Sequence, residues 1–203
     1  MARIQCPNAG EIVEVMRSRN YRVFENPDGH DLNLVGIRNS ASDANRFDDW
    51  LCVFYFFDGI WNLFAFPATT DPGTYYRENP LNVRGTAIMK PGQYRRAYQV
   101  GRHKGYKALQ QSGPITVFRD NNRDSELDVN GVDEHEGLHA VNIHRASRVR
   151  ASTRVDRWSA GCQVVQDPDH FDFLMTLCDR GAQKFGNSFT YTLLESDDFS
   201  GQA

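Results

Sequence analysis

The stretch WLCVFYFF, residues 50–57, followed by Asp58-Gly59 and then by IWNLFAF, residues 60–66, decides the fold of this chain. Both runs are rich in aromatic and β-branched residues, which favour strands. The Asp-Gly dipeptide between them accepts the positive φ angles of a two-residue hairpin turn. The sequence therefore predicts an antiparallel hairpin of two hydrophobic strands in the densest part of the core.

Further strand-like segments lie on both sides of this hairpin, most of them beside Gly or Pro. They are residues 21–24, 32–37, 74–76, 86–89, 115–118, 138–144 and 191–194. Their short and regular spacing along the middle of the chain predicts a protein that is mainly β.

Two helices complete the predicted α+β fold. Asn8 suits the N-cap of a short N-terminal helix, with Glu11 in its first turn. Asp167 and Pro168 suit the start of one late helix, whose apolar residues recur on one face. We expect this late helix to end at Arg180-Gly181, because glycine commonly follows the last helical turn.

Length and composition exclude several classes of protein. The chain of 203 residues fits one domain, or one domain with an appendage. Its net charge of -3 disfavours a nucleic-acid binder. The longest apolar run falls far short of the roughly 20 residues that span a bilayer, and the first residues lack the apolar region of a secretory signal. We expect a monomer made in the cytoplasm, without a membrane span.

The cysteines, at positions 6, 52, 162 and 178, are too sparse for a disulfide scaffold or a cysteine-rich zinc site. Only Cys162 lies in a chemically informative context. It ends the string Ser159-Ala160-Gly161-Cys162, and His144 lies eighteen positions before it. This pair supplies both groups that thiol catalysis requires.

The residues around Cys162 suit nucleophilic catalysis. A cysteine thiol is mostly protonated at neutral pH, so it needs a base such as His144 to take its proton. Gly161 lets the backbone bend and lets a carbonyl approach, while nearby main-chain N–H groups can bind the oxyanion. We expect Ser159 to shape or hydrogen-bond the same turn.

These residues resemble the L,D-transpeptidase catalytic domain family of peptidoglycan metabolism, whose motif is a histidine, a gap of similar length and then Ser-His-Gly-Cys. The resemblance covers roughly residues 50–195, including Thr70-Asp71-Pro72-Gly73, which is similar to the family's Thr-Pro-x-Gly segment. It implies an L,D-transpeptidase-like β-sandwich over residues 49–203. Residues 1–48 would form a helix-and-strand appendage packed on that domain.

The resemblance also implies an activity. Cys162 would attack a peptide carbonyl of a peptidoglycan stem peptide at meso-diaminopimelate, with His144 as the base and without a cofactor. An amine or water would then resolve the thioester, and the sequence leaves transpeptidation and hydrolysis open. Trp158 and Arg145 are the candidate substrate-binding residues, and the Arg145 main-chain carbonyl is expected to orient the His144 imidazole.

The chain departs from the family pattern at three positions. Ala160 stands where the family usually has a second histidine, and Val164 stands where Arg or Asn is common, with Gln163 beside it. Arg145 replaces the small residue that usually follows the catalytic histidine. These departures indicate a divergent relative.

The substrate implied by the resemblance lies in the periplasm or cell wall, whereas the chain has no export signal in its first residues. This combination favours a phage-encoded lytic enzyme, an injected effector, or a protein exported by a partner. A non-enzymatic phage or secretion-system structural protein that retains the fold is an alternative.

A second motif predicts a different enzyme. His135-Glu136-Gly137-Leu138-His139 matches the zinc-peptidase pattern His-Glu-x-x-His, which needs a helix. The glycine and the alternation of residues 138–144 favour a strand instead. In a strand the two histidines would lie about 13 Å apart, too far to share one zinc ion. A zinc peptidase therefore stays the less favoured alternative.

Two charged stretches have open interpretations. The segment 119–134 is rich in acids and amides, but no register fits the calcium-binding EF-hand pattern, which favours a solvated loop. The arginines between His144 and Cys162 either bind stem-peptide carboxylates or lie on a solvated loop.

Overall fold

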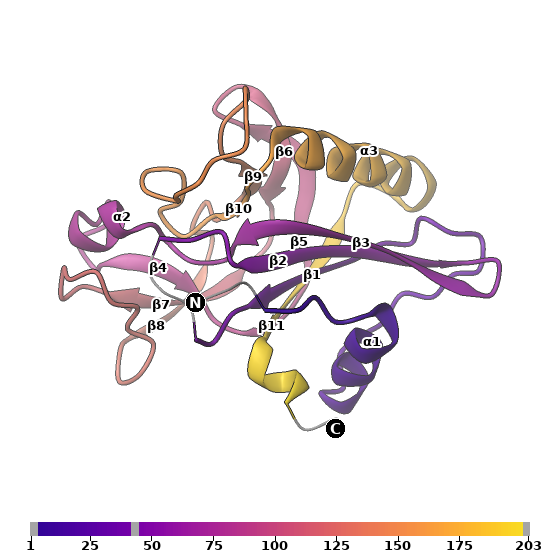
Figure 1. Ribbon diagram of the computed structural model, residues 1–203, viewed down its shortest axis with the longest axis horizontal. Helices are drawn as coiled ribbons and strands as arrows, with labels where there is room; N and C mark the ends of the chain where they lie inside the picture. Colours follow the sequence, from indigo (N-terminus) through magenta and orange to yellow (C-terminus); the bar gives the residue numbers. More distant parts are fainter. Residues whose placement is uncertain (1–3, 42–44, 201–203) are drawn as a thin grey trace.

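The computed structural model describes residues 4–41 and 45–200. In this part of the chain, eight strands close into a barrel in the order β1-β11-β5-β6-β9-β10-β3-β2, and three form a separate sheet in the order β4-β7-β8 (Figure 1). The barrel strands are β1 (Asn33–Arg38), β2 (Asp49–Phe57), β3 (Ile60–Thr69), β5 (Gly92–His103), β6 (Tyr106–Gln111), β9 (Ile143–Arg145), β10 (Gln163–Val165) and β11 (Phe189–Glu195). The other elements are β4 (Thr86–Met89), β7 (Ile115–Asp120), β8 (Glu134–Gly137), α1 (Ala9–Ser18), α2 (Thr74–Glu78), α3 (Pro168–Phe185) and the 3-10 helix η1 (Ser196–Phe199).

The predicted hairpin is confirmed as β2 and β3, which pair from Asp49 to the turn. Asp58 and Gly59 have φ angles of 50° and 78°, as a two-residue hairpin turn requires. Leu51 belongs to the main core, which includes inward-facing barrel residues, whereas Cys52 packs in a second core beneath α1. Both faces of the hairpin are covered near the barrel, which explains the apolar residues on each face there, whereas Phe57 and Ile60 at its tip are exposed.

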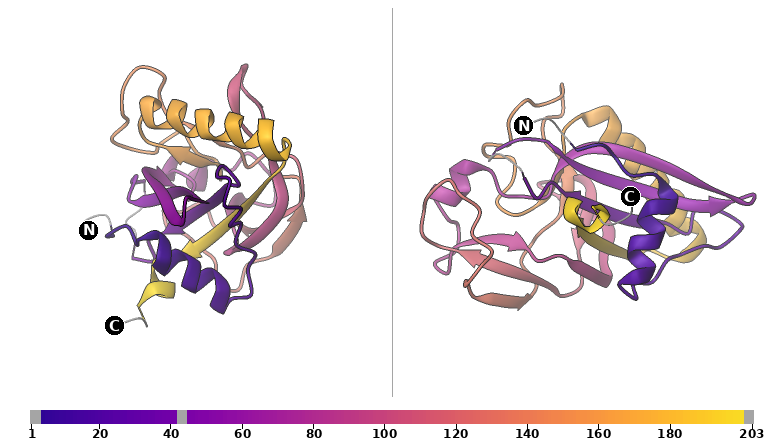
Figure 2. Two further views of the ribbon diagram at one scale, coloured as in Figure 1. Left: turned by 90° about the vertical axis from the view of Figure 1, so that its right-hand side faces the viewer. Right: turned by 60° about the horizontal axis from the view of Figure 1, so that its bottom comes forward.

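Helices α1 and α3 lie on opposite sides of the barrel (Figure 2). Both begin as predicted: Asn8 and Glu11 form a reciprocal capping box, and Asp167 caps α3. The predicted end of α3 at Gly181 is wrong. The helix continues to Phe185, and Gly186 follows it with a φ of 93°. Gly181 instead lies inside the helix, where a Cβ would come within 3.1 Å of a main-chain oxygen on the neighbouring segment.

The mainly β class is confirmed, but the eight strands close into a barrel in place of the two facing sheets of a sandwich. β1 pairs with β2 on one side and runs parallel to β11 on the other. The strand of the expected 1–48 appendage is therefore part of the barrel itself, while α1 packs on the outer face of that barrel.

Residues 74–76 form the helix α2, so their prediction as a strand is wrong. Residues 21–24 do not form a strand either. Side-chain amides take the place of a partner strand: Gln93 bonds to both main-chain polar groups of Arg22, and Asn33 bonds to both of Phe24. A backbone satisfied in this way needs no sheet ladder.

The predicted strand 138–144 is correct only at its end, where β9 begins. Ala140 has a φ of 56°, which breaks the extended backbone. The Gln111 side chain again replaces a partner strand, since its Oε1 accepts from the N–H groups of His139 and Val141 and its Nε2 donates to the Gly137 carbonyl. Strands β5, β6, β8 and β10 were not among the strand segments predicted from the sequence.

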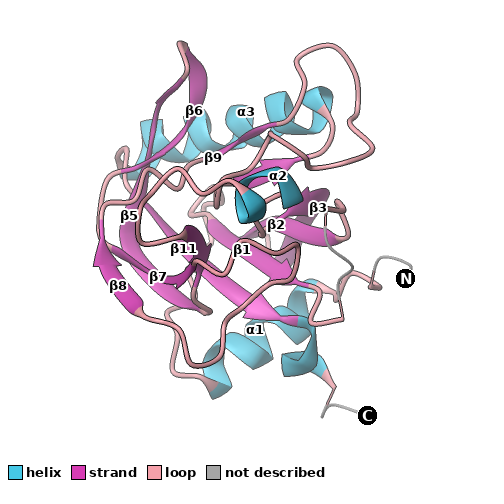
Figure 3. Ribbon diagram, turned by 90° about the vertical axis from the view of Figure 1, so that its left-hand side faces the viewer, coloured by secondary structure: helices cyan, strands magenta, loops and turns pink. Residues whose placement is uncertain are grey.

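The three-stranded sheet lies to one side of the barrel together with α2 (Figures 1 and 3). One face of this sheet joins the main core through Ala87, Met89, Ile115 and Val117. Among the described residues, no helix has the length and apolar character needed to cross a bilayer.

Candidate active site

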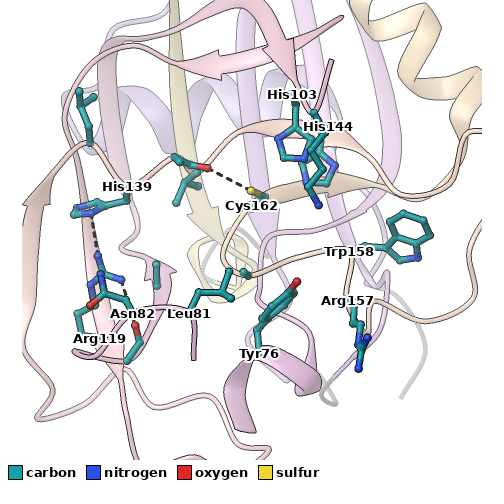
Figure 4. A pocket seen from close by; sticks show the side chains of 17 residues that line it. Tyr76, Leu81, Asn82, His103, Arg119, His139, His144, Arg157, Trp158 and Cys162 are labelled. Carbon is teal, nitrogen blue, oxygen red and sulfur yellow. Dashed lines mark hydrogen bonds between the residues drawn. The ribbon is translucent and has the colours of Figure 1, made fainter. Parts of the chain in front are cut away.

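His144 and Cys162 lie on neighbouring parallel strands. His144 is in β9, Cys162 immediately precedes β10, and the register pairs His144 with Val164. Ile143 and Val165 belong to the main core, so the alternating side chains of His144 and Cys162 face outward, into one cavity of about 510 Å³ (Figure 4). The topology thus brings together the two residues that the sequence motif indicated.

The His144 ring is held in one tautomer. It is buried, and its Nδ1 lies 2.7 Å from the main-chain oxygen of Arg145. A carbonyl oxygen only accepts, so Nδ1 carries the proton and Nε2 keeps a free lone pair. Burial, helped by the nearby His103, lowers the pKa of His144 to about 3. His144 is therefore a neutral base at neutral pH, oriented by the carbonyl expected to orient it.

The Cys162 thiol is also neutral at rest. Burial raises its pKa to about 11, and the main-chain N–H of Asn142 and the charge of Lys104 offset this only in part. Sγ donates to the main-chain oxygen of Ala140 at 3.6 Å (Figure 4). Within residues 4–41 and 45–200, no hydrogen bond joins Sγ to His144, so the site is not a preformed ion pair.

The turn before Cys162 depends on the side chain of Ser159 and on the absence of a side chain at Gly161. Ser159 Oγ donates to the Cys162 main-chain oxygen at 2.8 Å and accepts from the Gly161 N–H at 3.1 Å. Gly161 has a φ of 119°, and a Cβ there would lie 2.4 Å from the Ala87 main-chain oxygen. Ser159 thus shapes the turn as expected. Because the Gly161 N–H is engaged, the Cys162 N–H, which has no partner in the described chain, is the available oxyanion donor.

His103, at the end of β5, is a site residue that sequence reasoning missed. Its ring stacks on that of His144, with centroids 4.1 Å apart and planes within 7°. Asn142 Nδ2 donates to His103 Nδ1 at 3.1 Å, which leaves the His103 proton on Nε2. Burial lowers the pKa of His103 as well. Its only sequence signal is the Lys104-Gly105 dipeptide, which forms the turn between β5 and β6 with positive φ angles.

The two candidate substrate-binding residues have different positions. Trp158 lines the cavity and is 43% exposed. The Arg145 guanidinium lies 4.0 Å from the centre of the Tyr106 ring and lines a different hollow beside α3. The Arg145 side chain is therefore not placed with Cys162, because stacking on Tyr106 directs it elsewhere. Of the other motif departures, Ala160 lines the cavity, whereas Val164 is buried.

The segment predicted as a zinc-peptidase motif does not converge on a metal site. His135 lies in β8 and His139 lies beyond it, so the required helix is absent. Arg119 Nη2 lies 3.0 Å from His139 Nδ1, and His139 Nε2 lies 3.0 Å from the His135 main-chain oxygen. A guanidinium only donates and a carbonyl only accepts, so neither His139 nitrogen has a free lone pair for zinc.

Residues 121–133 form a mostly exposed loop, as interpreted, but Arg119 and the buried Asp120 belong to β7 and Glu134 begins β8. Asn122 Nδ2 donates to Asp124 and Asp128, so the amide and carboxylates bond to one another. Within the described ranges, no group of three His, Cys, Asp or Glu side chains is arranged to hold a metal ion.

The function of this protein has to be inferred from the geometry of the cavity, because comparison with known proteins gives no match. No protein-family model, curated protein or solved structure matches the chain.

Proposed function

We propose that this protein is a cysteine acyl-transfer enzyme of the L,D-transpeptidase type that acts on peptidoglycan stem peptides. One observation carries the proposal: a neutral histidine with a free Nε2 and a thiol face the same cavity from adjacent strands. A fixed tautomer and an adjacent nucleophile are the requirements of histidine-assisted thiol attack.

The reaction proceeds in two acyl-transfer steps. Sγ leaves the Ala140 carbonyl, gives its proton to His144 Nε2 and bonds to the substrate carbonyl carbon. The Cys162 N–H donates to the resulting oxyanion. When the C–N bond breaks, Nε2 returns the proton to the leaving amine and a thioester remains. Water or a second amine then attacks the thioester, again with Nε2 as base, and the thiol is restored.

Several features support a fold related to that of the L,D-transpeptidases. The chain order is histidine strand, Ser-x-Gly-Cys turn, parallel strand, helix and closing strand. The Gly73 N–H donates to the Ser159 main-chain oxygen at 2.9 Å, which ties the segment Thr70-Asp71-Pro72-Gly73 to the turn before Cys162. Both segments of the resemblance therefore lie side by side.

The cavity is suited to a peptide of a few residues. Its volume lies within the range of ordinary ligand sites. The lining side chains of Leu81, Leu138 and Trp158 are exposed, so an apolar surface is available to a bound ligand. Because stem peptides lie outside the cytoplasm, we place the site of action in the periplasm or cell wall.

The test is to incubate purified peptidoglycan and defined muropeptides with the wild-type protein, Cys162→Ala, His144→Ala and Cys6→Ala. Cys6→Ala is the matched thiol control, because Cys6 lies beneath α1, away from the cavity. We expect product and a trapped thioester adduct, seen by mass spectrometry, only from the wild type and Cys6→Ala. Product formation should persist in a chelator.

Three outcomes contradict the proposal. Activity that survives Cys162→Ala excludes the thiol mechanism, and loss on chelation alone favours a zinc peptidase. A folded protein that forms neither product nor adduct favours a non-enzymatic structural role.

A further inference from the structure

The cavity that holds Cys162 has an uneven charge. Its lining includes three cations, Lys104, Arg119 and Arg157, and no Asp or Glu side chain. The whole chain carries more acids than bases. In the described parts of the chain, none of these three cations forms an ion pair, although Arg157 stacks on the Tyr75 ring. Within residues 4–41 and 45–200, no carboxylate therefore contacts these charges.

Arg119 is the most fixed of the three cations. It lies on β7, and its Nη1 donates to the Gly85 main-chain oxygen at 3.3 Å while its Nη2 donates to His139 Nδ1 at 3.0 Å. Each terminal nitrogen of a guanidinium carries two hydrogens, so one N–H on each remains uncommitted. Pairs of neighbouring N–H donors on a guanidinium match the two oxygens of a carboxylate.

A second arginine strengthens the local field. Arg84 Nη1 lies 3.1 Å from His135 Nδ1, and the charge of Arg84 contributes to lowering the pKa of Arg119, after burial. Two arginines thus lie near one another, each bonded to a histidine, and among the described residues neither is bonded to a carboxylate. Their repulsion would be relieved by an anion bound at Arg119.

Arg119 also has a fixed position relative to the nucleophile. It is the cross-strand partner of Ala87 between β4 and β7. Gly161, next to Cys162, packs against the Ala87 main-chain oxygen. One strand pair therefore connects the guanidinium to the turn that carries the thiol, and Figure 4 shows both in one cavity.

We propose that Arg119, supported by Arg84, anchors a carboxylate subsite in the Cys162 cavity. Resting on the proposed function, the ligand is a stem peptide with a free carboxylate near the attacked bond. Arg119 then determines specificity for the acidic form of that peptide over its amidated form.

The first experiment measures anion binding without catalysis. Cys162→Ala protein with labelled histidines is titrated with disodium glutarate or with uncharged glutaramide at constant ionic strength, and the His139 ring signal is followed by NMR. We expect a saturable shift with glutarate alone. Arg119→Gln should weaken binding about tenfold or more, and Arg119→Lys, which keeps the charge, should weaken it less. Arg148→Gln, an exposed arginine outside the cavity, is the control.

Equal responses to glutarate and glutaramide would overturn the subsite, as would glutarate binding that Arg119→Gln does not weaken. Circular dichroism checks that each variant is folded. Because this experiment needs no turnover, its result holds whether or not stem peptides are the substrate.

The second experiment compares kcat/KM for a stem peptide with a free meso-diaminopimelate carboxylate and for its carboxamide. Arg119→Gln should lower the ratio of kcat/KM for the acid to kcat/KM for the amide about tenfold or more. An equal loss on both peptides contradicts the subsite but not the proposed function. A wild type that turns over neither peptide contradicts the proposed function, while the glutarate titration still decides the subsite.

Discussion

Two cavities of similar volume, about 510 and 590 Å³, differ in how their charges are neutralised. The larger one is lined by Arg38 and Arg77 together with four acids. Arg38 Nε lies 2.8 Å from Asp71 Oδ1, and Arg77 donates to main-chain oxygens. The Cys162 cavity has cations without acids. The two cavities therefore differ little in volume. What sets the smaller one apart is that its cations lack carboxylate partners among the lining residues and lie in the same cavity as Cys162.

The largest expected effect tests the structural role of the charges in the larger cavity. Arg38→Met removes one partner of a buried ion pair and leaves Asp71 without its cation. It also removes the donors to the main-chain oxygens of Thr70 and Met89. We expect the free energy of unfolding to fall by about 3–5 kcal/mol. Urea denaturation measures it, and a loss below about 1 kcal/mol would contradict a structural role.

Next in size is the effect of releasing the wall of the Cys162 cavity. Gln111→Leu removes the side-chain bonds that hold residues 137–141, and with them the Ala140 oxygen that accepts from Cys162. We expect a loss of about 1–3 kcal/mol in unfolding free energy and a lower kcat/KM. Gln110→Leu, at the exposed neighbouring position, is the control. Equal effects from the two changes would show that the Gln111 bonds do not matter.

The pH dependence tests the neutral pair within the Cys162 cavity. If His144 is the base, as proposed, its pKa of about 3 means that kcat/KM should stay flat down to acidic pH. His103→Ala uncovers the His144 ring and removes the contribution of His103 that lowers its pKa. The pKa of His144 should therefore rise, and the acidic limb of the kcat/KM profile should move to higher pH. His103→Phe keeps a ring over His144 and should move it less. An unmoved limb in His103→Ala would show that His103 does not tune His144.

The same depression of the pKa also affects stability. Between pH 3 and about 6.5 the unfolded chain binds a proton at His144 that the folded chain does not. This contribution to stability therefore rises with pH across that window and is lost as the pH falls. In His103→Ala the lower pH limit of this window should rise, because the pKa of His144 in the folded chain rises. Urea denaturation at several pH values would measure the change in the pH dependence of unfolding free energy.

The smallest effect completes the comparison. Arg119→Gln, the counterpart of Arg38→Met in the Cys162 cavity, removes no ion pair and relieves the repulsion from Arg84. We expect the free energy of unfolding to change by less than about 1 kcal/mol. Urea denaturation of Arg119→Gln and Arg38→Met under the same conditions measures the difference between their free energies of unfolding. A loss as large as that of Arg38→Met would mean that Arg119 is structural.

Local patterns in the sequence predicted the elements whose determinants are local. The Asp58-Gly59 turn fixes the hairpin, and the Asn8 and Asp167 caps fix the starts of α1 and α3. The motif around Cys162 also indicated His144, which lies on the neighbouring strand β9. It further predicted that Ser159 hydrogen-bonds within the turn.

Long-range contacts explain the errors. Residues 21–24 and 138–142 have strand-like patterns, but amide side chains of Gln93 and Gln111, distant in sequence, replace their partner strands. His103 reaches the site only because β5 and β6 form a hairpin that returns to β9. The Arg145 side chain leaves the site because it stacks on Tyr106. None of these partners lies within a local window of the sequence.

The close approach of Gly161 to the Ala87 carbonyl holds the Cys162 turn against the strand pair that carries Arg119. Ala87 faces Arg119 across one strand pair, so the backbone fixes the positions from which the Cys162 and Arg119 side chains start. The bonds from Arg119 to the Gly85 main-chain oxygen and to His139 Nδ1 then restrain the end of its side chain. If Arg119 binds a substrate carboxylate as proposed, the number of bonds between that carboxylate and the scissile carbonyl decides which peptides react, and a homologue one methylene longer or shorter should react more slowly.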